Sequence, residues 1–152
     1  MKKKTWEEFS VGEEVSSIHS LTITEAHLVS WGHLTMDFYP LHMDANFASN
    51  TVFGKRIAHG PLIFSLGVGM MTSTGFYGDA VMAWLGIENM KIPKPVFIGD
   101  TLYTIGNVLE KKETGKTDRG VMIMHYEILN QEDETVMAYD LIFLIRRKAE
   151  RK

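Results

Sequence analysis

A single apolar helix followed by four strand-like segments constrains the fold of this chain more than any other feature. Six apolar side chains surround the axis of the helix expected at residues 62–74: Leu62, Ile63, Leu66, Val68, Met70 and Met71. A helix that is apolar on all sides is expected to be buried, and Gly67 and Gly69 would allow close backbone contact. Pro61 suits the first helical position, where its missing N–H has no helical partner.

The second half of the chain is rich in β-branched and aromatic residues and is divided by turn-forming sequences. The expected strands are residues 80–92, 101–110, 120–129 and 135–146. The first half predicts one strand at residues 13–23, a helix at 25–34 capped by Thr24, and a short helix after Asp44. This order predicts an α+β fold in which an antiparallel sheet wraps around the central helix.

Composition limits the classes of function. With 152 residues, 45% of them hydrophobic, and a net charge of -3, we expect one domain over residues 1–152 and no nucleic-acid partner. The chain has no cysteine, which excludes disulfides and thiol nucleophiles. Acidic residues follow Lys4 where a signal peptide needs an apolar run, and no segment is long enough to span a membrane. A cytoplasmic protein without membrane contact is expected.

Two short motifs carry the chemistry. Asp37 and His42 flank Pro40, which fixes the backbone, so both side chains are expected on a rigid loop. A carboxylate and an imidazole can share acid and base work near neutral pH. Gly60 comes directly before Pro61, and its N–H at the start of the apolar helix is a candidate oxyanion donor. The combination predicts an enzyme.

Each candidate also has a structural interpretation. Asp37 could cap a helix and His42 could be a structural loop histidine, but the full set of motifs favours catalysis. His59 is expected to bond to backbone and position Gly60, and Ser65 either reaches substrate or bonds back to the preceding turn. The six histidines show no tight ligand spacing, so no metal site is expected. No nucleotide-binding glycine motif is present, so no redox cofactor is expected either.

The motifs together resemble one known family. Residues 37–44, Phe53-Gly54 with Ile57-Ala58-His59-Gly60, and residues 95–102 (PVFIGDTL) are similar to the MaoC-like (R)-specific enoyl-CoA hydratases in order and spacing. The resemblance runs from about Phe9 to Arg147. It implies a hot-dog fold with five to six antiparallel strands around a long helix, and a homodimer or larger homo-oligomer with active sites at the dimer interface.

The resemblance also implies a reaction. The family interconverts (R)-3-hydroxyacyl-CoA and enoyl-CoA in fatty acid metabolism, with no cofactor beyond the CoA of the substrate. Asp37 and His42 then match the catalytic pair, Gly60 matches the oxyanion donor, and Tyr39, His59 and Ser65 are candidate substrate-binding residues. Tyr39 departs from the family pattern, which usually has asparagine there.

The sequence leaves alternatives open for the acyl substrate and for the class of protein. Residues 34–36 and 85–87 also resemble family members that act on short branched acyl-CoAs of the mesaconyl type. A thioesterase on the same fold would place a carboxylate on the central helix, and residues 62–74 contain none. A non-catalytic acyl-CoA-binding or regulatory protein is the remaining alternative.

Overall fold

Eleven elements make up the computed structural model, which describes residues 2–148. The expected domain also includes residues 1 and 149–152, which lie outside the described part. The first half holds η1 (Trp6–Glu8), β1 (Glu14–Ser16), β2 (Leu21–Thr22), α1 (Glu25–Thr35), α2 (Pro40–Met43), α3 (Ala45–Ser49) and α4 (Gly60–Ser73). The second half holds β3 (Val81–Lys91), β4 (Thr101–Glu113), β5 (Arg119–Leu129) and β6 (Thr135–Arg146).

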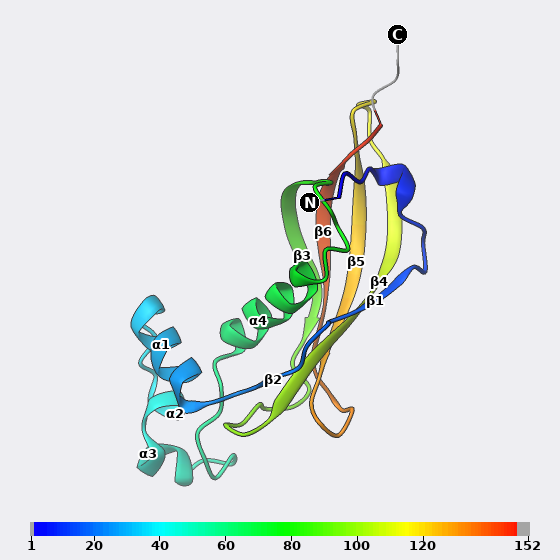
Figure 1. Cartoon of the computed structure of the whole chain (residues 1–152). Coiled ribbons are helices and arrows are strands. Elements are labelled where there is room, and N and C mark those ends of the chain that lie inside the picture. Colours follow the sequence, from blue (N-terminus) through cyan, green and yellow to red (C-terminus); the bar gives the residue numbers. More distant parts are fainter. Residues whose placement is uncertain (1, 149–152) are drawn as a thin grey trace.

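The strands form one six-stranded sheet. Its order is β1-β4-β5-β6-β3, β2 also pairs with β4, and the neighbouring strands are antiparallel. α4 lies against one face of the long, twisted strands, while α1, α2 and α3 gather near the N-terminal end of α4 (Figure 1). The predicted α+β architecture and its four long strands are confirmed. Within residues 2–148, no helix combines the length and hydropathy needed to cross a membrane.

The prediction of one strand at residues 13–23 is wrong, because two short strands form there. Ser16 pairs with Ile105 and Leu21 pairs with Leu102. The chain advances five residues from Ser16 to Leu21, whereas β4 advances only three residues between their partners. Two residues between β1 and β2 therefore cannot pair with β4. The polar segment around Ile18, which is 61% exposed, separates β1 from β2.

The helices of the first half follow their capping residues. Thr24 caps α1, and Asp44 caps α3 by accepting a 3.0 Å hydrogen bond from the backbone N–H of Phe47. The expectation that His42 lies on a loop is wrong, because α2 includes it. Pro40 occupies the first position of this helical turn, where a proline is tolerated, so it begins a helix instead of only fixing a loop.

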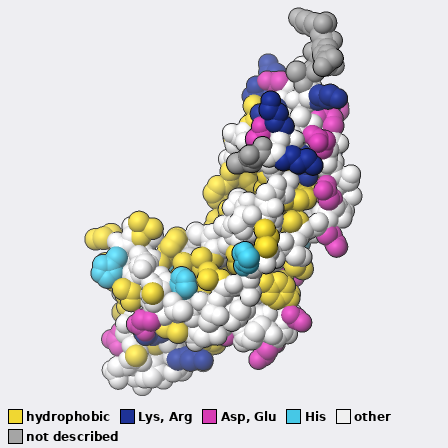
Figure 2. Space-filling view, viewed as in Figure 1, with side chains coloured by type: hydrophobic (Ala, Val, Ile, Leu, Met, Phe, Trp, Pro, Cys, Tyr) yellow, Lys and Arg dark blue, Asp and Glu magenta, His cyan; other side chains and the backbone are white. Residues whose placement is uncertain are grey.

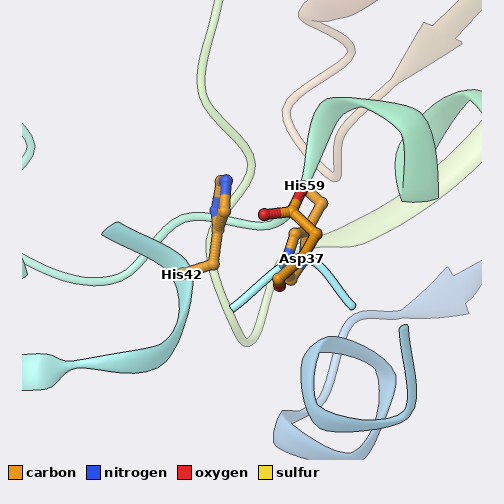
Figure 3. Close-up of side chains that lie close together, drawn as sticks. All are labelled: Asp37, His42 and His59. Atoms are coloured by element: carbon orange, nitrogen blue, oxygen red, sulfur yellow. Dashed lines mark hydrogen bonds between the residues drawn. The ribbon is translucent and has the colours of Figure 1, made fainter. Parts of the chain in front are cut away.

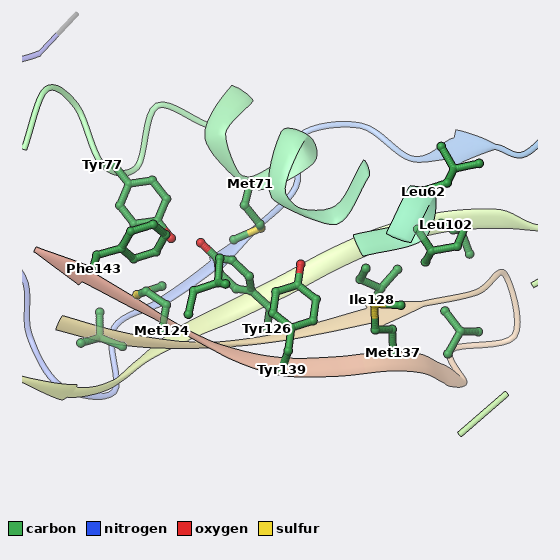
Figure 4. Packing of buried hydrophobic residues seen from close by; sticks show 14 of the residues in the cluster. Leu62, Met71, Tyr77, Leu102, Met124, Tyr126, Ile128, Met137, Tyr139 and Phe143 are labelled. Carbon is green, nitrogen blue, oxygen red and sulfur yellow. The ribbon is translucent and has the colours of Figure 1, made fainter. Parts of the chain in front are cut away.

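α4 begins at Gly60, so Pro61 is its second residue and not its first as expected. One face packs on the sheet through Leu62, Ile63, Gly67 and Met71, whereas Ser65, Gly69 and Thr72 are exposed. The prediction of a helix buried on all sides is therefore wrong for a single chain. Figure 4 shows Tyr126 and Tyr139 rising from β5 and β6 toward α4, with Leu62 and Met71 directed into the same core.

Gly67 marks the closest approach of α4 to the sheet. A β-carbon at this position would lie 2.4 Å from Cδ1 of Ile128 and 2.8 Å from the hydroxyl oxygen of Tyr139. Both neighbours are fully buried, so they have little room to move. Gly69 does not share this role, contrary to expectation, because a β-carbon there would meet nothing within 4 Å.

This difference predicts opposite effects of two matched substitutions. Gly67→Ala should lower the free energy of unfolding by about 1–3 kcal/mol, because the added methyl group overpacks the core. Gly69→Ala should be neutral or stabilising by up to about 1 kcal/mol, because alanine is the better helix former. Urea unfolding followed by circular dichroism measures both. Equal stabilities for the two variants would contradict this account of the helix–sheet contact.

Candidate active site

Asp37, His42 and His59 converge beside the N-terminus of α4. Each contributes a carboxylate oxygen or ring nitrogen to a group whose atoms all lie within 4.8 Å of one another. Asp37 follows α1, His42 lies in α2, and His59 is the residue before α4 (Figure 3). Three segments that are separate in the sequence therefore meet at one point, and the predicted pair of Asp37 and His42 is brought together.

His42 is held by a backbone carbonyl. Its Nδ1 lies 2.8 Å from the carbonyl oxygen of Ile57. Because a carbonyl oxygen can only accept, Nδ1 carries the proton and Nε2 keeps a free lone pair. Ile57 is fixed in turn, since residues 57–58 pair with residues 96–97 through a bridge and the 2.7 Å bond from Ala58 N–H to the Val96 carbonyl. The imidazole is therefore oriented as a base before any substrate binds.

His59 lies behind this pair and is fully buried. Its Nε2 donates to the backbone carbonyl of Asp37 at 3.1 Å, and its ring lies 4.0 Å from the His42 ring, centroid to centroid. Burial lowers the pKa of His59 and the nearby His42 lowers it further, while the bond to Asp37 opposes both effects. His59 is therefore neutral at physiological pH. Its Nδ1 is buried without a hydrogen-bond partner among the described residues.

Two backbone features place Asp37, and the sequence analysis missed both. Met36 ends α1 in the left-handed conformation, with φ of 64°, which is uncommon for a residue other than glycine. Gly32 lies under the turn, where a β-carbon would be 3.2 Å from the Asp37 carbonyl oxygen. The absence of a side chain at Gly32 lets the turn pack closely on α1. An isolated glycine within a helical pattern was the available signal.

Gly60 supplies the first N–H of α4. N–H groups in the first turn of a helix have no partner within the helix, and the helix dipole favours negative charge at this end. A β-carbon at Gly60 would meet only Cδ1 of Ile92, at an ordinary 3.5 Å. The protein interior therefore does not require glycine here, in contrast to Gly67. Room for a ligand to approach the backbone is a separate reason for a glycine at this position.

A small cavity adjoins these groups. It has a volume of about 170 Å³ and is lined by both His42 and Gly60. Its other walls are mainly apolar, including Ile63, Ile92 and Met137, and Lys94 also lines it. Lys94 forms an ion pair with Glu134. An apolar space with a base and a helix N-terminus on its wall suits a small uncharged reacting group.

The structure places Tyr39 and Ser65 at the margins. The Tyr39 side chain is 59% exposed, and its backbone N–H donates to Oδ1 of Asp37 at 3.3 Å. The Ser65 hydroxyl donates to the Pro61 carbonyl at 2.8 Å, which is the bond to the preceding turn that the sequence allowed. The Tyr39 ring lies 6.3 Å from the His42 ring, centroid to centroid. The predicted role of Tyr39 and Ser65 in substrate binding stays a prediction.

The cluster also has the composition of a metal site. Two imidazoles and one carboxylate can bind zinc, and sequence spacing did not reveal this set because His42 and His59 are far apart in the chain. One nitrogen of each ring already donates to a backbone carbonyl. The remaining ring nitrogens and the carboxylate are hydrogen-bond acceptors, and a water molecule can donate to two of them, whereas a cation could bind all three.

The buried, neutral state of His59 predicts a pH dependence of stability. Its pKa is lowered on folding, so below about pH 6.5 the unfolded chain binds a proton that the folded protein does not. The contribution of His59 to the free energy of unfolding is therefore fully present above that pH and is lost as the pH falls. The free energy of unfolding of the wild type should fall between pH 7.5 and pH 5.5, and His59 can contribute at most about 1.4 kcal/mol per pH unit to that fall. In His59→Gln this contribution should be missing, so the fall should be smaller. Urea titrations at both pH values test it, and an unchanged decline would contradict it.

Comparison with known proteins gives relatives along most of the chain. Residues 8–130 match the MaoC-like domain family. YdeM of Bacillus subtilis, an uncharacterised protein, is 29% identical over 143 residues, covering 93% of this chain and 98% of YdeM. Protein MaoC of Klebsiella aerogenes is 33% identical over 100 residues, 66% of this chain but 29% of MaoC. An (R)-specific enoyl-CoA hydratase of Aeromonas caviae is 36% identical over 75 residues, 49% of this chain and 54% of the hydratase.

Solved structures agree with these matches. A protein from Archaeoglobus fulgidus described as a monoamine oxidase regulatory protein has a TM-score of 0.91 and 34% identity, covering 96% of both chains. Rv0216 of Mycobacterium tuberculosis, described as a double hot-dog fold, has a TM-score of 0.84 and 16% identity, covering 98% of this chain and 46% of Rv0216. The predicted hot-dog fold is therefore confirmed. The relatives of this chain include (R)-specific enoyl-CoA hydratases, and the chain belongs to the MaoC-like domain family.

Proposed function

We propose that this protein adds water to, or removes it from, an α,β-unsaturated acyl thioester, with CoA as part of the substrate and an (R)-3-hydroxyacyl group as the hydrated form. The observation that supports this most directly is the arrangement of His42. Its Nδ1 is fixed on the Ile57 carbonyl, which leaves Nε2 free, and the residue belongs to a cluster with the Asp37 carboxylate beside the start of α4. A base and an oxyanion donor thus line one cavity, and a second proton carrier lies in the same cluster as the base.

In hydration, Nε2 of His42 and the Asp37 carboxylate hold one water molecule. The water oxygen forms a bond to the β-carbon as the carbon–carbon double bond breaks, and its proton passes to the Asp37–His42 pair. A proton from the pair then reaches the α-carbon, so that one water is added and nothing is oxidised or reduced. We assign the two proton transfers to the pair as a unit, because both groups belong to one cluster.

Charge on the thioester oxygen is the main barrier to this reaction. As water attacks, the carbonyl oxygen becomes an enolate oxygen, and a fixed N–H donor stabilises it most effectively where water is excluded. The Gly60 N–H at the positive end of α4 is the donor we propose. Pro61 has no N–H, which leaves Gly60 as the donor between His59 and Leu62 at the start of the helix.

His59 supports the pair from behind. It bonds to the Asp37 carbonyl and stacks on His42, so it positions both members without needing to exchange a proton. Its neutrality matters, because a second positive charge 4.0 Å from the His42 ring would oppose protonation of the base during the reaction. Water is the occupant we propose for the cluster, since hydration requires no other co-reactant.

Substitution of the pair tests the proposal. Asp37→Asn and His42→Ala should each lower kcat for crotonyl-CoA hydration by about 10²–10⁴-fold, the usual range for general acid–base groups. Loss of conjugated thioester absorbance measures turnover, after dialysis against EDTA so that a metal-dependent reaction is detected separately. Circular dichroism and elution volume should be unchanged. Near-normal turnover by both variants would rule out this pair, and release of free thiol instead of hydration would indicate a thioesterase.

We further propose that two copies of the chain assemble through β3. Among residues 2–148, β3 pairs with β6 on one side and with no strand on the other. Its exposed large apolar side chains are Val81, Met82, Trp84, Leu85, Ile87 and Met90. A long apolar edge strand that remained in water would promote aggregation, so pairing with the same strand of a second copy is a favourable alternative. Hydrophobic side chains also gather over α4 beside this edge (Figure 2).

Charges placed on this edge should prevent the assembly. The double substitution Leu85→Lys and Ile87→Lys introduces like charges that would face each other across paired strands, so the protein should become monomeric. Light scattering during gel filtration should give twice the mass of one chain for the wild type and one chain for the variant. Leu109→Lys is the control, since Leu109 is 46% exposed but lies on β4. A dimeric double variant would show that β3 is not the interface.

A further inference from the structure

The cluster of Asp37, His42 and His59 presents hydrogen-bond acceptors, because its ring donors are already used by backbone carbonyls. Nδ1 of His42 donates to the Ile57 carbonyl at 2.8 Å, and Nε2 of His59 donates to the Asp37 carbonyl at 3.1 Å. The other nitrogen of each ring therefore carries a lone pair, since a neutral imidazole has one donor and one acceptor. An ionised carboxylate is also only an acceptor. Three acceptors thus meet beside the start of α4.

A single water molecule cannot satisfy these three acceptors. It has two hydrogens, so it can donate to His42 and to the Asp37 carboxylate, as the hydration proposed above requires, but not to a third group. Nδ1 of His59 is buried and has no hydrogen-bond partner among residues 2–148. A buried acceptor without a partner is unfavourable. A metal cation, unlike a water molecule, can bind all three lone pairs at once.

Both imidazoles are already oriented as they are in metal sites. A histidine that binds a metal usually donates its other ring N–H to a carboxylate or a backbone carbonyl, which fixes the tautomer and the direction of the lone pair. His42 and His59 each make such a bond to a carbonyl. The carbonyl that holds His42 belongs to Ile57, which is itself paired with Phe97. The bonds that support a metal site are therefore in place before any cation binds.

The spacing of the three residues suits one small cation. One nitrogen or carboxylate oxygen from each residue lies within 4.8 Å of those from the other two. Zinc binds nitrogen and carboxylate oxygen at about 2.0–2.2 Å, so two of its tetrahedral ligand atoms are about 3.4 Å apart, and the atoms here would need to approach by about 1.4 Å at most. Asp37 and His42 are only half-buried, so small side-chain rotations can supply this approach.

The donor set determines both the kind of cation and its effect. Two imidazoles and one carboxylate suit zinc, whereas magnesium and calcium prefer oxygen ligands. A bound zinc ion would use the lone pair of His42 Nε2 and a lone pair of the Asp37 carboxylate. Neither group could then take a proton from an attacking water molecule. The pair therefore cannot serve a metal ion and the hydration at the same time.

We propose that Asp37, His42 and His59 bind a zinc ion and that this ion inhibits the hydration of the acyl thioester. The inhibition rests on the function proposed above, whereas the binding of zinc does not. The proposal differs from the expectation of no metal site, because the fold brings His59 to a pair that sequence spacing alone considered without it. The active fraction of the protein then depends on the concentration of free zinc.

Calorimetric titration of the full chain with zinc chloride, without a histidine tag, tests the site. The wild type should bind one zinc ion per chain. Asp37→Asn and His59→Gln each remove one ligand and should weaken this binding at least about tenfold, with circular dichroism showing that both variants fold. His125→Gln is the control and should leave the affinity unchanged. His125 is also an imidazole beside carboxylates, those of Asp140 and Glu127, but it lies on the sheet.

Initial rates of crotonyl-CoA hydration test the inhibition. Zinc should lower the rate in proportion to the fraction of protein that has bound it, EDTA should restore the rate, and magnesium at the same concentration should have no effect. Unchanged zinc affinity in either Asp37→Asn or His59→Gln, or weaker binding in His125→Gln, would overturn the site. Hydration that continues or increases with zinc bound would overturn the inhibition. If no enoyl-CoA is hydrated but zinc binding still depends on Asp37 and His59, the proposed function fails and the zinc site stands.

Discussion

The close contact of α4 with the sheet at Gly67 determines where every group of the candidate site can lie. Without a side chain at Gly67, the helix backbone approaches Ile128 and Tyr139 so closely that a β-carbon would overlap both. A packed contact of this kind fixes the helix against rotation as well as against translation, because neighbouring side chains leave no alternative position. The N-terminus of α4, which carries His59 and Gly60, is therefore fixed relative to the strands.

Asp37 and His42 are connected to the N-terminus of α4 by hydrogen bonds that involve backbone carbonyls. His42 bonds to the Ile57 carbonyl, and the Asp37 carbonyl accepts from His59, so the His42 ring and the Asp37 backbone are held by the segment that leads into α4. Backbone acceptors have an advantage here, because they do not titrate and cannot change rotamer. The left-handed Met36 carries a conformational cost that local contacts must offset, and such costs often occur at functional sites.

Local patterns predicted the elements well, because the signals were local. Thr24 and Asp44 cap the helices that they were expected to cap, and the four long strands follow their β-branched and aromatic composition. The spacing of Asp37 and His42 around Pro40 indicated that they form a pair, and the resemblance to one family supported it. The contact of His59 with both residues, the anchoring carbonyl of Ile57 and the closeness of Gly32 to Asp37 join residues far apart in sequence, and periodicity contains no information about them.

The burial of α4 was the clearest error, and its cause is informative. Phe64, Leu66, Val68 and Met70 pack against the core but are only half-buried, so packing within one chain covers only part of the apolar surface of the helix. An apolar surface of this kind is costly in water unless a second surface or a ligand covers it. The proposed partner pairs with β3, whose Trp84 stacks on Phe64 of α4. A helix that is apolar on all sides is thus expected where one side packs on the sheet and others face substrate and partner.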